Sequence, residues 1–280
     1  MIRFEETLYP HWSQTFRAQK VLYHERSELQ DLAIFESAIF GRILALDGVI
    51  QTTEADEHHY HEMMIHVPLL AHGAVQAVCV VGGGDGGALR EVLKHPGVHA
   101  TLVEIDPAVI AISRRYLPAI SVGSFDDPRV TIIIADGVRY MADSGPLFDV
   151  IIIDSTDPQG PGEGLFQESF YASCRRRLKP GGILVTQNGV PFLQPDEVYR
   201  TYCQLQPHFA DVWFFTAAVP TYVGGLMAMG WGSLDPAHRL RPQELIRTRA
   251  AKVDLETRYY TPNIHVASFA LPRYIERLLL

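Results

Sequence analysis

A glycine run broken by a single aspartate follows the first long apolar segment of the chain. Ala77–Val81 leads directly into the loop GGGDGG at residues 82–87. A glycine loop between a first strand and a first helix lets a ligand approach the backbone closely. Twenty residues beyond Gly84, Glu104 ends the next apolar run, where a carboxylate can bind both hydroxyls of a ribose. Gly82, Gly84 and Glu104 therefore predict a nucleoside-binding site.

The aspartate within this loop, Asp85, restricts which nucleoside is expected. Two like charges about 4 Å apart cost roughly 4 kcal/mol at an effective dielectric of about 20, which disfavours a pyrophosphate against Asp85. The same repulsion disfavours S-adenosylmethionine if its carboxylate lies here. A ligand with an amine in that place gains the interaction with opposite sign, and decarboxylated S-adenosylmethionine is such a ligand.

Further acidic residues follow the next two apolar runs. Asp136 follows the run 130–134, Asp154 follows 148–153, and Asp157 comes three residues later. Because ligands of open α/β sheets lie at the carboxyl ends of the strands, these carboxylates should converge on one crevice with Asp85 and Glu104. Each aspartate alone is equally consistent with a helix cap or a turn. Together they favour a cationic ligand, a metal ion or protonation of one acid.

The histidines of residues 58–66 raise the possibility of a metal site. His61 and His66 are one position too far apart for the HExxH pattern, in which both histidines share a helical face. We therefore expect no metal here, and treat Tyr60 and His61 as walls of the crevice, with a packing or surface role as the alternative.

The arrangement of strands and helices predicts an α/β fold with two domains. Residues 1–52 contain short β-rich runs separated by turns, and they predict a small N-terminal β domain. Residues 53–280 alternate apolar strands with helices, which is typical of a Rossmann-like, methyltransferase-type, doubly wound sheet. Thr53–Asp56 reads as a capping box before a helix ending near Gly73. Residues 155–164 are rich in glycine and proline and predict an irregular loop that acts as a lid.

Composition and charge limit the possible partners. The formal net charge is −8, which argues against a nucleic-acid partner and suits cationic small molecules. The three cysteines include no C-x-x-C pair, so neither a disulfide framework nor a zinc site is indicated. No signal-peptide pattern and no membrane-spanning apolar run is evident, and a cytoplasmic location is expected.

With these residues assembled, the chain resembles the polyamine aminopropyltransferase family, which includes the spermidine synthases. The motifs that carry the resemblance are spread over nearly the whole chain: QDL at 30–32, LDGVIQ at 46–51, DE at 56–57, YHEM at 60–63, GGGDGG at 82–87, VEID at 103–106, DSTDP at 154–158, GP at 160–161, QNG at 187–189, PTY at 220–222 and GG at 224–225.

The resemblance implies a homo-oligomer, either a dimer or a tetramer, and a role for each motif residue. Nucleotide contacts are implied for Gln30, Glu104, Asp136, Gly137 and Pro161. Amine contacts are implied for Tyr60, His61, Asp85, Asp157 and Tyr222, and Asp154 is the implied proton acceptor.

The expected reaction transfers the aminopropyl group of decarboxylated S-adenosylmethionine, a co-substrate, to putrescine. It gives spermidine and 5′-methylthioadenosine without a metal or redox cofactor. Three alternatives share parts of the pattern: an S-adenosylmethionine-dependent amine N-methyltransferase, aminopropyl transfer to another diamine such as cadaverine, and a non-catalytic polyamine-binding protein.

Overall fold

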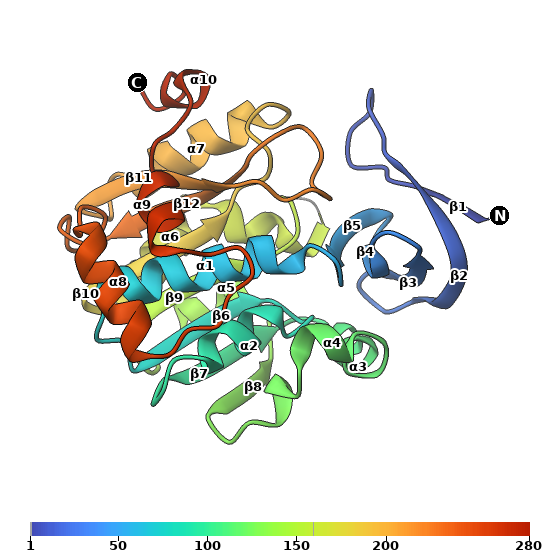
Figure 1. Cartoon of the computed structure of the whole chain (residues 1–280), viewed down its shortest axis with the longest axis horizontal. Helices are drawn as coiled ribbons and strands as arrows, with labels where there is room; N and C mark the ends of the chain where they lie inside the picture. Colours follow the sequence, from blue (N-terminus) through green and yellow to red (C-terminus); the bar gives the residue numbers. More distant parts are fainter. Residues whose placement is uncertain (1, 159) are drawn as a thin grey trace.

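The computed structural model describes residues 2–158 and 160–280, and it separates a small N-terminal sheet from a larger α/β domain (Figure 1). The small sheet is antiparallel, with its strands paired in chain order. Its strands are β1 (Ile2–Glu5), β2 (Thr15–Arg26), β3 (Asp31–Ser37), β4 (Gly41–Leu46) and β5 (Val49–Thr53).

The larger sheet has the strand order β11-β12-β10-β9-β6-β7-β8. β6, β7, β8, β9 and β10 pair in parallel, whereas β12 runs antiparallel between β10 and β11. This is the Rossmann-like architecture that the sequence predicts, with one antiparallel strand that its pattern did not reveal. The strands are β6 (Ala77–Gly82), β7 (His99–Glu104), β8 (Val130–Ile134), β9 (Phe148–Asp154), β10 (Leu178–Gln187), β11 (Asp211–Ala217) and β12 (Met227–Ser233).

Helices cover both faces of this sheet. The α-helices are α1 (Glu57–His72), α2 (Gly87–Leu93), α3 (Pro107–Tyr116), α4 (Pro118–Ser121), α5 (Gly137–Ala142), α6 (Glu168–Arg177), α7 (Pro195–Leu205), α8 (Gln243–Lys252), α9 (Pro262–Ala267) and α10 (Arg273–Glu276). The 3₁₀ helices are η1 (Ser124–Asp126) and η2 (Gly160–Phe166).

Alternate residues of the central strands belong to two different cores. Val150 and Ile152 of β9 pack in a cluster with residues of α1 and α2, whereas Ile151 and Ile153 pack in a second cluster with residues of α5 and α6. Successive side chains of a strand point to opposite faces, so a strand covered on both faces reads as a continuous apolar run. This is why β6 and β9 were recognisable from sequence.

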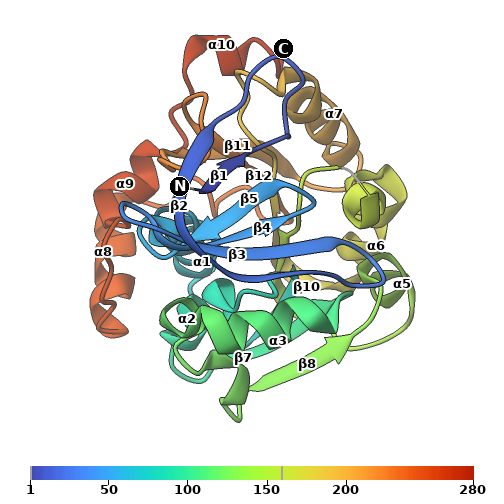
Figure 2. The same ribbon diagram turned by 90° about the vertical axis from the view of Figure 1, so that its right-hand side faces the viewer.

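The small sheet packs on the α/β domain through an apolar interface. Leu32 and Leu44 of the sheet form one buried cluster with Val109 and Ile112 of α3 and with Ile120 of α4. Figure 2 shows α3 running beneath β3. This contact brings the small sheet to the edge at which the parallel strands end.

Two local expectations need correction. The capping box forms only in part: the N–H of Asp56 donates to the Thr53 hydroxyl at 3.4 Å, but that hydroxyl donates to the Asp56 carboxylate at 2.6 Å, and no side chain caps α1, which begins at Glu57. The second half of the expected irregular loop, residues 160–164, belongs to the 3₁₀ helix η2, which continues to Phe166, because short 3₁₀ turns commonly form connectors. The helices α8, α9 and α10 were not anticipated.

Within the described ranges, no helix has both the length and the apolar character that crossing a membrane requires.

Candidate active site

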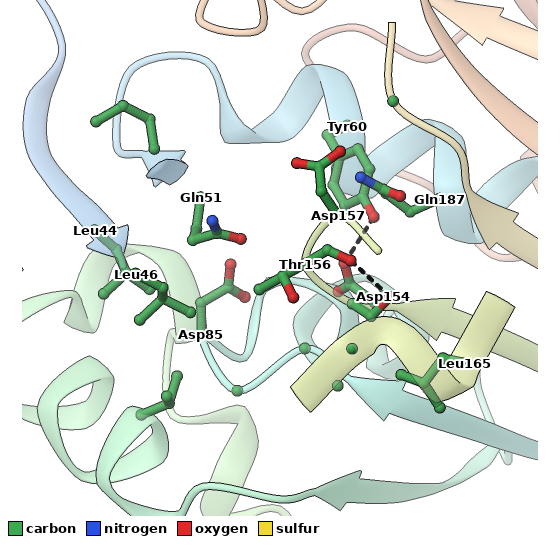
Figure 3. Close-up of a pocket in the computed structure, with 18 of the residues that line it drawn as sticks. Leu44, Leu46, Gln51, Tyr60, Asp85, Asp154, Thr156, Asp157, Leu165 and Gln187 are labelled. Carbon is green, nitrogen blue, oxygen red and sulfur yellow. Dashed lines mark hydrogen bonds between the residues drawn. The ribbon is translucent and has the colours of Figure 1, made fainter. Parts of the chain in front are cut away.

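One cavity lies at the carboxyl ends of β6, β7, β8 and β9, against the small sheet. It gathers the site residues that the sequence and the resemblance indicated: Gln30, Tyr60, His61, Gly82, Gly84, Asp85, Glu104, Asp136, Gly137, Asp154, Asp157 and Tyr222. Pro161 is in η2, beside the lining residue Gly162, and its side chain is outside the described part of the chain. In Figure 3, Tyr60, Asp154, Asp157 and Gln187 group on one side, with Asp85 and Gln51 towards Leu44 and Leu46.

The glycine loop and Glu104 are in direct contact. A Cβ added to Gly84 would lie 2.7 Å from Oε2 of Glu104, so a larger residue would displace that carboxylate. Oε1 of Glu104 accepts a hydrogen bond from the backbone N–H of Asp106 at 2.9 Å, which orients the group. Burial raises the pKa of Glu104 to about 7, and the hydrogen bond from Asp106 opposes that shift. A pair of ribose hydroxyls would supply the donors that a buried carboxylate requires.

Gln30 reaches this region from the small sheet. Its Nε2 donates to Oδ2 of Asp106 at 3.0 Å, and the Ser27 hydroxyl donates to the same oxygen at 2.7 Å. The other oxygen of Asp106 caps α3 by accepting from the N–H of Ala108. Asp106 therefore joins the small sheet to the strand that carries Glu104.

Asp136 has a structural role as well as a place in the cavity. It is the N-cap of α5, and its Oδ1 accepts from the N–H of Val138 at 2.8 Å. Gly137 follows as the first residue of α5, so the N-terminal end of this helix, with the N–H groups of Val138 and Arg139 bonded to Asp136, lies at the cavity. The capping reading of this aspartate, which was open from sequence, is confirmed by the structure without removing Asp136 from the cavity wall.

Asp85 belongs to a chain of four alternating charges that the sequence did not reveal. Nε2 of His61 lies 3.4 Å from Oδ2 of Asp85, and its Nδ1 lies 2.7 Å from Oε2 of Glu57. Arg90 in turn donates to both oxygens of Glu57, at 2.9 and 2.8 Å. His61 is thus a buried cationic partner for Asp85 within the protein itself.

The charges in this chain stabilise one another. Burial alone would lower the pKa of His61, but Asp85 and Glu57 hold it well above its usual value. Burial alone would raise the pKa of Asp85, but His61 and the N–H of Gly87 hold it below its usual value. Asp85 is therefore an anion at the wall of the cavity, and His61 acts partly by positioning it.

Asp154, the last residue of β9, lines the cavity and has one oxygen without a hydrogen-bond partner among the described residues. Its Oδ1 accepts from the Tyr60 hydroxyl at 2.7 Å, and its buried Oδ2 has no hydrogen-bond partner among the described residues. Burial raises the pKa of Asp154 to about 6, with the charge of Asp85 adding to the shift and His61 and Tyr60 opposing it. A carboxylate with this pKa and an unpaired oxygen is suited to accept a proton near neutral pH.

Asp157 lies in a polar cluster formed by segments distant in sequence. Its Oδ1 accepts from Nε2 of Gln194 at 2.7 Å, and burial raises its pKa. Tyr222 closes the wall near Tyr60, with the two rings edge to face at 6.0 Å, and its hydroxyl donates to the carbonyl of Gln51.

Several lining residues were missed. Glu6, Leu8, Tyr9 and Gln194 also line the cavity. Glu6 and Tyr9 precede the first long strand and lie in no glycine-rich or strand-end motif, so their place was not visible from local pattern. One sequence signal could have drawn attention to Gln194: it directly precedes Pro195, and a proline commonly marks the first turn of a helix, here α7.

The remaining histidines of α1 lie apart from this chemistry. His66 is buried between Glu91 and His95, at 2.8 and 3.0 Å, and His59 contacts the carbonyl of Ala218. Within the described residues, no group of three or more histidine, cysteine or acidic side chains is placed to hold a metal ion.

Comparison with known families matches nearly the whole chain. Residues 57–241 match the model of the spermine/spermidine synthase domain, and residues 2–54 match that of the spermidine synthase tetramerisation domain. The polyamine aminopropyltransferase of Salmonella schwarzengrund is 52% identical over 277 residues, which are 99% of this chain and 97% of that protein. The corresponding protein of Pseudomonas syringae pv. tomato is 52% identical over 98% of this chain and 96% of its own length.

Solved structures agree with these sequence matches. A spermidine synthase in complex with the transition-state analogue AdoDATO superposes with a TM-score of 0.93 at 38% identity, covering 99% of this chain and 94% of that chain. The spermidine synthase of Thermotoga maritima superposes with a TM-score of 0.92 at 37% identity, covering 100% and 94%. The resemblance seen in the motifs is thereby confirmed, and the chain belongs to the spermidine synthase family of polyamine aminopropyltransferases.

Proposed function

We propose that this enzyme transfers the aminopropyl group of decarboxylated S-adenosylmethionine to putrescine, giving spermidine and 5′-methylthioadenosine. One observation carries the proposal: a single cavity joins the Glu104 nucleoside site to the carboxylates Asp85, Asp154 and Asp157. The donor carries a sulfonium and an amine, and the acceptor carries two ammonium groups. Such a cavity attracts cations and repels the carboxylate of S-adenosylmethionine.

The reaction is one displacement. The amine nitrogen attacks the propyl carbon attached to sulfur, a C–N bond forms, and the C–S bond breaks with its electron pair passing to sulfur. The amine arrives protonated, because its pKa is close to the value of about 10.4 that lysine shows in water. Its proton passes to the carboxylate of Asp154, either directly or through a water molecule. Because the sulfonium is already a good leaving group, alignment supplies most of the acceleration.

Product analysis tests this proposal against its alternatives. The enzyme is incubated separately with decarboxylated and with intact S-adenosylmethionine, each with a panel of diamines, and products are identified by mass spectrometry. Spermidine and 5′-methylthioadenosine from the decarboxylated donor and putrescine are expected. If the intact donor gave a methylated amine, the enzyme would be an N-methyltransferase. If cadaverine were the preferred acceptor, the reaction would be aminopropyl transfer to that diamine. If diamines bound but no product formed, the protein would be a polyamine-binding protein.

We also propose a homodimer or homotetramer, supported by the match of residues 2–54 to a domain named for tetramerisation. Light scattering coupled to size exclusion measures the mass directly. A single monomeric species at working concentration would refute this proposal.

Glu104→Gln is expected to weaken binding of both the donor and 5′-methylthioadenosine by about 1–3 kcal/mol, the scale of a charge-assisted hydrogen bond. Calorimetric titration measures both affinities. A 2′,3′-dideoxy analogue should be nearly indifferent to this substitution, because it lacks the hydroxyls that Glu104 would bind. If the analogue loses as much affinity as the natural nucleoside, Glu104 does not hold the ribose.

The pH dependence of kcat/KM for putrescine should show one acid limb near pH 6. The pKa of Asp154 is raised by burial to about 6, so below that pH the carboxyl is protonated and cannot accept the amine proton. Activity should fall about tenfold per pH unit below the limb. In kcat the limb should move to lower pH, because a bound diammonium favours the charged carboxylate. A kcat/KM profile that stays flat from pH 8 to pH 5 would contradict Asp154 as the base.

A further inference from the structure

Gln194, which lines the cavity, uses the whole hydrogen-bonding capacity of its side chain. Its Oε1 accepts from the Tyr9 hydroxyl and from the N–H of Val190, both at 3.0 Å. Its Nε2 donates to Oδ1 of Asp157 at 2.7 Å and to Oε2 of Glu197 at 3.2 Å. A side-chain amide has two acceptor lone pairs and two N–H donors, so all four are engaged.

The backbone around Gln194 holds this side chain in place. The N–H of Gln194 donates to the carbonyl of Val190 at 2.9 Å. Gly189 has φ +59, and a Cβ there would lie 2.2 Å from Oε1 of Gln194. Any side chain at position 189 would therefore overlap the Gln194 amide, and only glycine leaves room for it.

The partners of Gln194 come from both domains. Tyr9 belongs to the N-terminal segment, which also supplies Glu6 and Leu8 to the cavity wall. Asp157 follows β9, and Glu197 lies in the first turn of α7. Gln194 thus links Tyr9 of the N-terminal segment to the two acidic residues Asp157 and Glu197 of the α/β domain.

We propose that Gln194 is a positioning residue that fixes Asp157 and closes the cavity wall beside it, thereby setting the length of diamine that the enzyme accepts. This inference rests on the proposed function and deepens it. The reacting nitrogen must lie near Asp154, the last residue of β9, and the second ammonium then points to Asp157. Any change in the position of Asp157 changes the separation of the two anions that a diamine spans.

The neutral amide suits this task better than a charged side chain. A lysine or arginine would fix Asp157 but would also neutralise it and compete with the ammonium. A carboxylate would repel Asp157. Glu197 adds little negative charge, because burial and the charge of Asp157 raise its pKa to about 8. Gln194 therefore orients Asp157 while leaving its charge available to the substrate.

The test compares putrescine with cadaverine, which is one methylene longer. Gln194→Ala removes the contacts to Asp157 and Tyr9 and opens the cavity wall beside Asp157. We expect kcat/KM for putrescine to fall and the cadaverine-to-putrescine ratio of kcat/KM to rise by about tenfold, within the 10–200-fold range that one methylene commands in a fitted pocket. The KM of the donor should not change. Tyr9→Phe removes only the hydroxyl and should shift the same ratio in the same direction by a smaller factor.

Gln206→Ala is the matched control, since this glutamine is exposed at the other end of α7. It should leave the ratio at the wild-type value. A Gln194→Ala enzyme in which both diamines lose equally, or in which the donor KM rises with them, would show a merely structural role and overturn the proposal. If Gln194→Ala does not fold, an unchanged ratio in Tyr9→Phe overturns it instead.

Binding measurements separate this inference from the proposed function. Calorimetric titration of putrescine and cadaverine into enzyme saturated with 5′-methylthioadenosine reports diamine selectivity without turnover. A wild-type enzyme that makes no aminopropyl product refutes the function. A wild-type enzyme that makes spermidine, together with a Gln194→Ala enzyme whose diamine selectivity is unchanged in both assays, refutes only the role of Gln194.

Discussion

Asp154→Asn is expected to lower the single-turnover rate of aminopropyl transfer by about 10²–10⁴, the range for loss of a general base. The substitution keeps the shape of the side chain and its contact with Tyr60 but removes the basic oxygen. Asp154 lines the cavity, and its carboxylate keeps one oxygen without a hydrogen-bond partner among the described residues, so it has the capacity to take the proton. Donor binding should stay near the wild-type value, because Glu104 ends β7 and the glycine loop follows β6, so neither is changed by a substitution in β9.

Asp157→Asn is the comparison that separates chemistry from binding. Asp157 is held by Gln194 rather than by the end of a strand, and it should act mainly on diamine affinity. Rapid-quench measurements at saturating putrescine therefore should show a slow Asp154→Asn enzyme and a nearly normal Asp157→Asn enzyme. The opposite result, with Asp157→Asn inactive at saturation and Asp154→Asn merely requiring more amine, would reverse the two roles.

The second large effect is expected at Asp85, in the selection of the donor. Asp85→Asn should reduce the preference for decarboxylated over intact S-adenosylmethionine by about tenfold or more, which equals about 1.4 kcal/mol. The repulsion between two unscreened like charges 4 Å apart would be roughly 4 kcal/mol at an effective dielectric of about 20. His61 stands 3.4 Å behind Asp85 and opposes part of that field, so the full value is not expected. Calorimetric titration with each donor gives the ratio.

Asp136→Asn provides a matched carboxylate at the same cavity. Asp136 caps α5 on the far side of the glycine loop, and its loss should weaken both donors alike. An Asp85→Asn enzyme that also weakens both donors by the same factor would show that Asp85 faces neither the amine nor the carboxylate of the donor.

The parts of the fold visible from sequence are those encoded by neighbouring residues. Strands β6 and β9 were evident because both of their faces are buried, and the nucleoside site was evident because a glycine loop and Glu104 stand at a known spacing. The antiparallel direction of β12 was not evident, since a short run such as Met227–Ser233 has the same composition in either direction.

The parts of the site that escaped prediction depend on contacts between distant segments. Tyr9 and Gln194 are 185 residues apart, and Arg90 reaches Glu57 from another helix. A single sequence contains no periodicity that relates such positions. His61 shows the consequence: its place in the cavity was expected from the motif, but its two carboxylate partners, which decide its charge, became visible only in the folded chain.

The pairing of β6 with β9 has a consequence for how this enzyme can change over time. Gly82 pairs with Asp154 across the two strands, and the N–H of Gly83 donates to the carbonyl of Asp154 at 2.8 Å. The loop proposed to receive the donor and the residue proposed to activate the acceptor are therefore spaced by main-chain hydrogen bonds, at the roughly 4.8 Å separation of adjacent strands. Mutations of wall residues can alter which amine is chosen without disturbing this spacing. Substrate range and reaction geometry are thus encoded in different parts of the chain. Natural selection or protein engineering can therefore change the substrate range while the reaction geometry stays the same.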